Sequence, residues 1–305
     1  MRIVCIGSAH VDLRLALVGP PVAGTSNPAT ATRRIGGVAA NVARNAAALG
    51  AQVVIVAVVG ADPDGDRVLA GLAAAGVDVA AVERSAAGAT GTYAAVLDPA
   101  GDLVIGAAAT PLADLAAAGF ADRAAAACGN ADAVVLDANL PAAVLQRVAS
   151  GIPPGALLAA DPVSIPKAPR LAGVLERTGL LVGGLEEAGA LLGRRIGDAG
   201  EAAAALVAAG AGAAVVTRGA EGVVAADRSG VTRMPAIPAG SVKDVTGAGD
   251  ALLAATVVGI ASGRPLREAL RRGLAAAALT VAVEGPVDPG LSPERVAAAA
   301  GEAPR

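Results

Sequence analysis

The chain has 305 residues, which is long enough for one large α/β domain with a substantial core. Its net charge is −3 and its only aromatic residues are Tyr93 and Phe120, so it lacks the basic face and the stacking surface that binding to a nucleic acid polymer needs. Although the mean hydropathy is +0.61, no uncharged stretch is long and apolar enough to span a membrane. The first residues have the pattern of a strand and not of a signal peptide. We therefore expect a cytoplasmic protein without a membrane partner.

Short apolar runs alternate with longer helical patterns along most of the chain. The runs predict strands at residues 3–6, 53–59, 133–136, 156–160, 180–182 and 213–217. The helical patterns lie at residues 38–49, 65–75, 142–150, 185–192 and 199–209. This order predicts an α/β fold with a doubly wound, mainly parallel sheet flanked by helices. Three more helices, at 247–262, 265–283 and 293–300, would pack on one side of that sheet.

Two segments interrupt this rhythm, at about residues 12–35 and 88–110. The second has the pattern of a hairpin that turns at residues 99–102. Strands inserted into an α/β core suggest a small β lid on a single domain that spans residues 1–305. A lid would exclude water from a phosphoryl transfer, although a hairpin without that role has the same pattern. Exposed lid strands can also pair between subunits, which leaves a homodimer open.

Residues 244–250 read Asp-Val-Thr-Gly-Ala-Gly-Asp and lead directly into an apolar helical stretch. The free amides of Gly247, Ala248 and Gly249 would form an anion site at the start of this helix. Asp250 would lie beside that site and could accept a proton from an attacking alcohol. The alternative is an ordinary helix start in which Thr246 caps the helix and Asp250 complements its dipole.

A second glycine cluster, Gly36-Gly37-Val-Ala-Ala-Asn41, also precedes a helical pattern. The two glycines would allow a polar ligand to approach closely, and Asn41 could offer both a donor and an acceptor to a hydroxyl group. The alternative is a simple turn from strand to helix.

Several familiar kinds of site are absent from the sequence. The lysines Lys167 and Lys243 do not follow a glycine, so there is no P-loop. The only cysteines are Cys5 and Cys128 and the only histidine is His10, which excludes a disulfide framework and a zinc site.

The two glycine clusters together resemble the paired signatures of the ribokinase-like, or PfkB, family of carbohydrate and nucleoside kinases. Residues 36–41 are similar to the N-terminal signature and residues 244–250 to the more specific C-terminal one. The resemblance spans essentially the whole chain, and it implies a ribokinase-like fold and a kinase that uses ATP and Mg²⁺.

The resemblance also implies roles for individual residues. Asp250 would be the catalytic base, and the amides of Gly247, Ala248 and Gly249 would form the anion hole. The substrate contacts would come from Asp12, Gly36, Gly37, Asn41 and Tyr93, and a nucleotide-binding turn would contain Thr217, Gly219 and Gly222. Glu187 would act indirectly on magnesium. Backbone oxygens near Asp244 and Thr246 would hold the monovalent cation, K⁺, that some members carry.

Finer similarities point to the pseudouridine kinases within this family, at residues 25–28, 90–98 and 161–164. We therefore expect transfer of a phosphate to a primary hydroxyl of a ribose-containing small molecule, in the narrowest interpretation the 5′-hydroxyl of pseudouridine. Two departures from the family pattern, His10 and Gly184, both stand where asparagine is common. They leave open another nucleoside or sugar as substrate, and a noncatalytic nucleoside or nucleotide sensor on the same scaffold.

Overall fold

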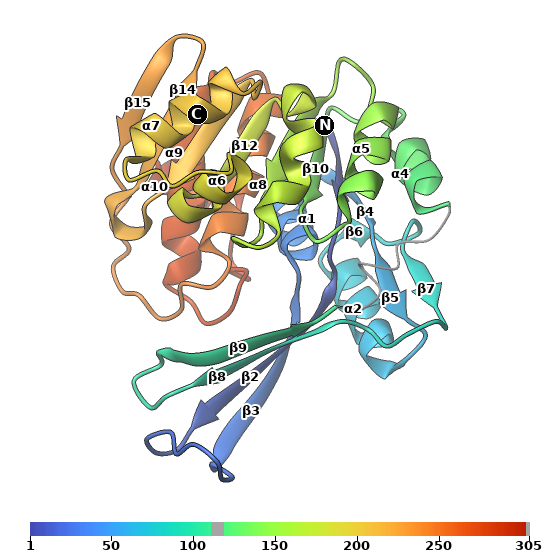
Figure 1. Cartoon of the computed structure of the whole chain (residues 1–305), viewed down its shortest axis with the longest axis vertical. Helices are drawn as coiled ribbons and strands as arrows, with labels where there is room; N and C mark the ends of the chain where they lie inside the picture. The colour runs from blue at the N-terminus through green and yellow to red at the C-terminus, as the bar shows by residue number, and fades with distance from the viewer. Residues whose placement is uncertain (111–118, 303–305) are drawn as a thin grey trace.

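The computed structural model describes residues 1–110 and 119–302. Its centre is a nine-stranded sheet in the order β15-β14-β13-β12-β11-β10-β1-β4-β6 (Figure 1). All strands pair in parallel except β14 and β15, which extend one edge in antiparallel fashion. The bounds are β1 Arg2–Ile6, β4 Gln52–Val56, β6 Val77–Asp78, β10 Ala133–Asp137, β11 Leu157–Asp161, β12 Leu180–Gly184, β13 Ala213–Thr217, β14 Val223–Asp227 and β15 Gly230–Met234.

Helices cover both faces of this sheet, which confirms the predicted doubly wound fold. One face carries α1 Val38–Ala48, α2 Pro63–Ala74, α8 Ala248–Ala261 and α9 Leu266–Val281, and the other carries α4 Phe120–Cys128, α5 Ala142–Gly151, η1 Ala168–Arg177, α6 Leu185–Leu191 and α7 Ala199–Ala208. The short helix α10 Pro293–Ala299 packs against α9, so the three C-terminal helices lie on one side as predicted.

Sequence explains why the central strands are apolar throughout. In β1, Val4 and Ile6 pack into one hydrophobic cluster, whereas Ile3 and Cys5 pack into the cluster on the opposite face. A strand covered on both faces has no solvent side, so its residues form a continuous apolar run. Within the described part of the chain, no helix has the length and apolar character needed to cross a membrane.

The single strand predicted at residues 53–59 is wrong. The chain forms β4, breaks at Ala57, and continues as β5 Val58–Gly60, which leaves the main sheet and pairs with β7 Glu83–Ser85. Apolar composition is the same on both sides of Ala57, so the pattern does not reveal the break. The Ala57 carbonyl accepts a hydrogen bond from the Glu83 amide at 2.9 Å, a contact between distant segments that redirects the strand.

The two segments that interrupt the βα order form a separate four-stranded sheet, in the order β3-β2-β8-β9, which projects away from the main body (Figure 1). Its strands are β2 His10–Leu17, β3 Ala29–Gly36, β8 Thr92–Leu97 and β9 Leu103–Ala109. The predicted hairpin is confirmed, because the Gly101 amide donates to the Asp98 carbonyl and the Asp98 amide to the Asp102 carbonyl.

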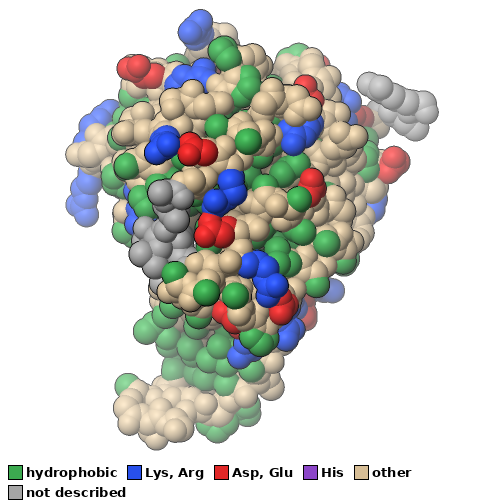
Figure 2. Space-filling model, turned by 90° about the vertical axis from the view of Figure 1, so that its right-hand side faces the viewer, with side chains coloured by type: hydrophobic (Ala, Val, Ile, Leu, Met, Phe, Trp, Pro, Cys, Tyr) green, Lys and Arg blue, Asp and Glu red, His purple; other side chains and the backbone are tan. Residues whose placement is uncertain are grey.

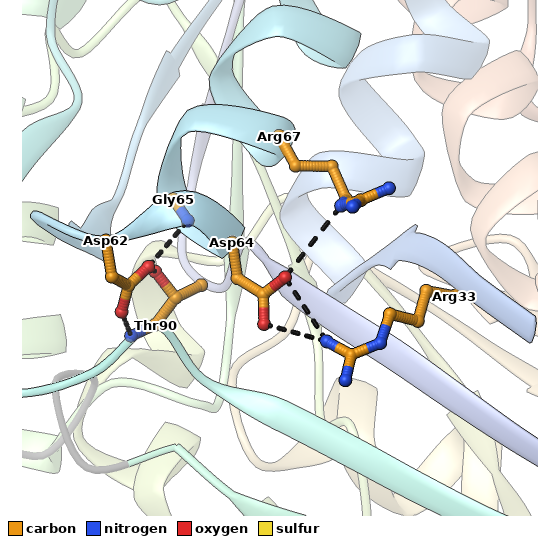
Figure 3. Close-up of polar contacts among 6 residues, drawn as sticks. All are labelled: Arg33, Asp62, Asp64, Gly65, Arg67 and Thr90. Atoms are coloured by element: carbon orange, nitrogen blue, oxygen red, sulfur yellow. Dashed lines mark hydrogen bonds and ion pairs between the residues drawn. The ribbon is translucent and has the colours of Figure 1, made fainter.

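Side chains at the start of α2 attach the base of this sheet to the main body (Figure 3). The Asp62 carboxylate caps α2 by accepting the Gly65 amide at 2.8 Å, and it also accepts the Thr90 amide at 2.7 Å. Beside it, Arg33 of β3 pairs with Asp64 at 3.2 Å. Both inserted segments are therefore tied to one helix N-terminus near the base of the sheet.

We expect Gly273→Ala to destabilise the protein, because Gly273 is where α9 crosses α8. A methyl group there would meet the Thr256 hydroxyl and would lie 2.8 Å from the Leu252 carbonyl oxygen. Overpacking of this kind costs about 1–3 kcal/mol, whereas alanine in an open helix is favourable by up to about 1 kcal/mol.

The measurement is the free energy of unfolding in urea. Gly129→Ala is the matched control, because Gly129 has helical backbone angles and its added methyl group would find no atom closer than 3.7 Å. Equal stability of the two variants would contradict the tight crossing.

Candidate active site

The direction in which strands are added reverses between β1 and β10, and polar groups gather at the carboxyl ends of these two strands. Asp137, the last residue of β10, is fully buried and accepts the Ser8 amide at 2.8 Å, the Ser8 hydroxyl at 2.9 Å and the Ala39 amide at 3.0 Å. The Asn139 side chain donates to the same hydroxyl at 2.8 Å. Such a reversal leaves a crevice that commonly binds ligands in α/β proteins.

Sequence reasoning missed this network. The available signal was an aspartate directly after a buried apolar strand, which is where Asp137 stands. The Asp137 carboxylate holds the first turn of α1 through the Ala39 amide, so it positions the helix that carries Asn41.

The helix α8 begins at Gly247, as the anion-site interpretation requires. Gly247 has φ 78°, and a Cβ there would collide with the Pro286 carbonyl, so only glycine fits. No side chain of a described residue caps this helix, and therefore the alternative in which Thr246 caps it is wrong. The amides of Gly247 and Gly249 donate no hydrogen bond to a described residue, which leaves them free for an anion, whereas the Ala248 amide donates to the Val245 carbonyl at 3.4 Å and is not free as predicted.

The two glycine clusters meet at this helix start. The side-chain amide of Asn41 on α1 donates a hydrogen bond of 2.9 Å to the Asp250 carboxylate in the first turn of α8. Asn41 is buried, and its side-chain oxygen has no partner among the described residues. Burial raises the pKa of Asp250 to about 7, assisted by the charges of Asp137 and Asp12 and opposed by the Asn41 hydrogen bond.

Further carboxylates converge on the same edge of the sheet. Asp161 ends β11, and its pKa is raised, first by burial and then by the charge of Asp250 and, to a smaller degree, by those of Glu187 and Asp137. Glu187 folds back onto the start of α6, where it accepts the Gly184 amide at 2.7 Å. Asp161 begins residues 161–164, which resemble the pseudouridine kinases, but the sequence predicts no role for its side chain.

A cavity of about 460 Å³ lies between the four-stranded sheet and the loop that precedes α8. Its lining includes Asp12, Arg14, Arg34, Tyr93, Asp244 and Thr246. Asp12 and Tyr93 are register partners on adjacent strands. The Asp12 carboxylate lies directly over Gly36, in space that a Cβ would fill, and 3.1 Å from His10 Nε2. The close approach predicted at Gly36 is therefore made by Asp12.

A second cavity, of about 620 Å³, borders the same helix start. It is lined by Thr217, Gly219 and Gly222 together with Ala248 and Gly249 of α8. Val242 and Val245 line both cavities, so the loop before α8 separates them. Each volume suits a small molecule. The predicted nucleotide residues thus lie apart from Asp12 and Tyr93, and Glu187 faces a third hollow that it shares with Thr217.

The described residues show two ligand-sized cavities on either side of the loop before α8, and that loop leads into a helix N-terminus without a side-chain cap, whose first turn carries a carboxylate of raised pKa. A family model for the pfkB family carbohydrate kinases matches residues 1–293.

Individual relatives agree with that match. The pseudouridine kinase of Escherichia coli K12 is 27% identical over 296 residues, covering 95% of this chain and 93% of that protein. The guanosine-inosine kinase of Exiguobacterium acetylicum is 30% identical, covering 96% of this chain and 97% of that protein. The structure of a carbohydrate kinase from Agrobacterium tumefaciens has a TM-score of 0.83 and 33% identity, covering 100% of this chain and 98% of that one. Solved ribokinases share the fold. The chain therefore belongs to the PfkB family of carbohydrate kinases and is a phosphotransferase with an alcohol group as acceptor.

Proposed function

We propose that the protein transfers the γ-phosphate of ATP to a primary hydroxyl of a ribose-containing small molecule, and that its acceptor is the 5′-hydroxyl of pseudouridine. The observation that carries this proposal is the hydrogen bond between Asn41 and Asp250. It joins the two glycine clusters and holds a carboxylate with a pKa of about 7 beside free helix amides. A phosphoryl transfer to an alcohol needs both of these groups at one point.

In the proposed mechanism, Asp250 is the catalytic base. The acceptor hydroxyl gives its proton to the Asp250 carboxylate while its oxygen bonds to the γ-phosphorus, and the bond from that phosphorus to the β–γ bridging oxygen breaks to release ADP. A pKa near the working pH is the best compromise between being deprotonated and being basic. The free amides of Gly247 and Gly249 donate to the oxygens of the transferring group and stabilise their charge. The Ala248 amide joins them by giving up its long hydrogen bond of 3.4 Å to the Val245 carbonyl.

We assign the nucleotide to the larger cavity, because it connects Thr217, Gly219 and Gly222 with the helix start that would bind the phosphates. ATP as donor agrees with the cytoplasmic location that the sequence predicts.

Magnesium fits the same region. Among the described residues there is no cluster of three potential metal ligands, but Mg²⁺ is commonly held by one or two carboxylates and the substrate phosphates. The charges of Asp250 and Glu187 add to burial in raising the pKa of Asp161, and a bound cation would relieve this repulsion. When bound, Mg²⁺ would neutralise charge on the donor phosphates, and Glu187 would act on it indirectly.

We assign the acceptor to the smaller cavity. Asp12 offers a carboxylate to paired hydroxyls, and the free side-chain oxygen of Asn41 can accept a hydrogen bond. Gly36 and Gly37 act indirectly, because the space that a Cβ would need is filled at Gly36 by the Asp12 carboxylate and at Gly37 by the Ser8 backbone. Tyr93 is the one aromatic ring outside the core, since Phe120 is fully buried, and it can stack on a base. This ring and two nucleoside-kinase relatives favour a nucleoside over a free sugar.

We further propose that the four-stranded sheet acts as a lid over this cavity, within a single domain spanning residues 1–305. Its outer strand β9 is exposed along its whole length, including Leu103, Val104 and Ile105. Figure 2 shows hydrophobic side chains gathered on the lower part of the molecule, where this sheet projects. An exposed apolar edge strand favours pairing with a second chain, so a homodimer through the lid stays a prediction.

The first test measures ADP release with ATP and magnesium against separate samples of pseudouridine, uridine, guanosine, inosine, ribose and fructose. We expect selective turnover of pseudouridine. Asp250→Asn should lower kcat by about 10²–10⁴-fold with little change in ATP affinity, because only the base is lost. Asp122→Asn, an exposed carboxylate on α4, is the matched control.

Turnover of another acceptor would replace the substrate and keep the kinase. A rise in melting temperature with a nucleoside but without ADP formation would instead indicate a sensor.

The dependence of kcat on pH should change in the variant Asn41→Ala. In the wild type, protonation of Asp250 should make kcat fall as the pH drops below about 7. The Asn41 hydrogen bond stabilises the charged carboxylate, so its loss should raise the pKa of Asp250 and move this acidic limb to higher pH. Asn45→Ala is the control, since Asn45 is also buried on α1 but bonds to the Asn41 carbonyl. An unmoved limb would argue against Asp250 as the titrating base.

Asp12→Ala should raise the KM for the acceptor by about 10- to 100-fold and leave the KM for ATP unchanged, because hydrogen bonds from substrate hydroxyls to a charged group would be lost. Asp66→Ala, on the exposed side of α2, controls for the loss of a carboxylate. An unchanged acceptor KM would remove Asp12 from the substrate site.

A further inference from the structure

The carboxylate of Asp244 accepts three hydrogen bonds from described residues. Arg14 Nη1 lies 2.6 Å from its Oδ2, the Gly285 amide donates to the same oxygen at 3.2 Å, and the Thr246 amide donates to Oδ1 at 3.0 Å. The Asp244 side chain is only 7% exposed. Burial opposes the charge, but these hydrogen bonds and the Arg14 ion pair outweigh it and hold the pKa of Asp244 below its usual value.

Arg14 comes from β2 of the four-stranded sheet, more than 200 residues away in the chain. It lies on the same face of β2 as Asp12, and Arg34 of β3 stands directly opposite Asp12, so all three face the loop before α8. Arg34 in turn pairs with Glu284 at 3.2 Å and fills the space beside Gly285. Both segments that flank the helix start, at Asp244 and at residues 284–286, are thus held by arginines of the sheet.

These residues do not fit the monovalent cation that the family resemblance implies at Asp244 and Thr246. A cation of this kind takes oxygen ligands, and the one buried carboxylate of the loop already accepts three hydrogen bonds. The positive side chains of Arg14, Arg34 and Lys243 line the same cavity and balance the three carboxylates of Asp12, Asp102 and Asp244. A further cation at the Asp244 carboxylate would meet repulsion from the Arg14 guanidinium, which lies 2.6 Å from that carboxylate.

We propose that the guanidinium of Arg14 takes the place of the monovalent cation, so that the protein binds and uses its nucleotide without K⁺. Arg14 is then a positioning residue. It fixes the Asp244 carboxylate, and this carboxylate fixes the Thr246 amide. The backbone that follows is thereby held with the amides of Gly247 to Gly249 in the conformation that binds phosphate. This inference rests on the proposed function in one respect, the binding of nucleotide phosphate at those amides.

The test measures the melting temperature and the ATP dissociation constant in potassium chloride and in tetramethylammonium chloride at equal ionic strength. For the wild type we expect both quantities to be the same in the two salts. Arg14→Ala should weaken ATP binding about tenfold in the tetramethylammonium salt. It should recover part of that loss in potassium chloride, because K⁺ can then reach the vacated carboxylate.

Two variants complete the comparison. Arg14→Lys keeps the charge and should bind ATP within a few-fold of the wild type. Arg147→Ala removes an exposed arginine of α5 that pairs with Asp122 of α4, away from the inserted sheet, and it should behave as the wild type. If Arg14→Ala does not fold, the melting temperature and the ATP dissociation constant of the wild type and of Arg14→Lys in the two salts still test the inference.

A wild type that melts higher or binds ATP more tightly in potassium chloride would overturn the inference. So would an Arg14→Ala variant that binds ATP as the wild type does, or one that is equally impaired in both salts. The melting temperatures need no acceptor and no turnover. Failure of the proposed function would appear instead as a wild type that releases no ADP with any acceptor.

Discussion

The packing of α1 against α8 is the contact on which the candidate site depends. Both helices lie on the same face of the sheet, are in contact and are rich in buried alanine, including Ala40 and Ala43 on α1 and Ala251 and Ala254 on α8. Side chains this small let the two helices approach closely, so Asn41 can reach Asp250 across the interface. The same approach withdraws Asp250 from water, which is the main reason its pKa rises to about 7.

The two helix starts are held by different parts of the fold. Asp137, at the end of a central strand, accepts the Ala39 amide of α1, and so the main sheet positions Asn41. The loop before α8 is held from the other side, by Arg14 of the inserted sheet through Asp244. A movement of the inserted sheet would therefore act directly on the start of α8. In the proposed function, the four-stranded sheet would have this electrostatic role in addition to that of a lid over the smaller cavity.

Much of the fold could be predicted from the pattern of apolar residues, because strands covered on both faces and helices with one buried face leave different periodicities. The pattern failed where neighbouring segments share a composition. Residues 52–60 are apolar on both sides of Ala57, and only the pairing of β5 with β7 separates them. The sequence pattern did not predict the antiparallel strands β14 and β15. The reason for β15 is that it is almost fully exposed and has no apolar run.

For the candidate site, the sequence by itself determined the chemistry of the two glycine clusters: a glycine before the start of α8, an acid in its first turn, and an amide on α1. These are local properties, because they depend on backbone angles and on position within a helix. Only the tertiary structure decided which groups meet. The contacts Asn41 with Asp250 and Arg14 with Asp244 each join residues more than 200 positions apart, and the raised pKa of one carboxylate and the lowered pKa of the other follow from burial and partners that no local pattern contains.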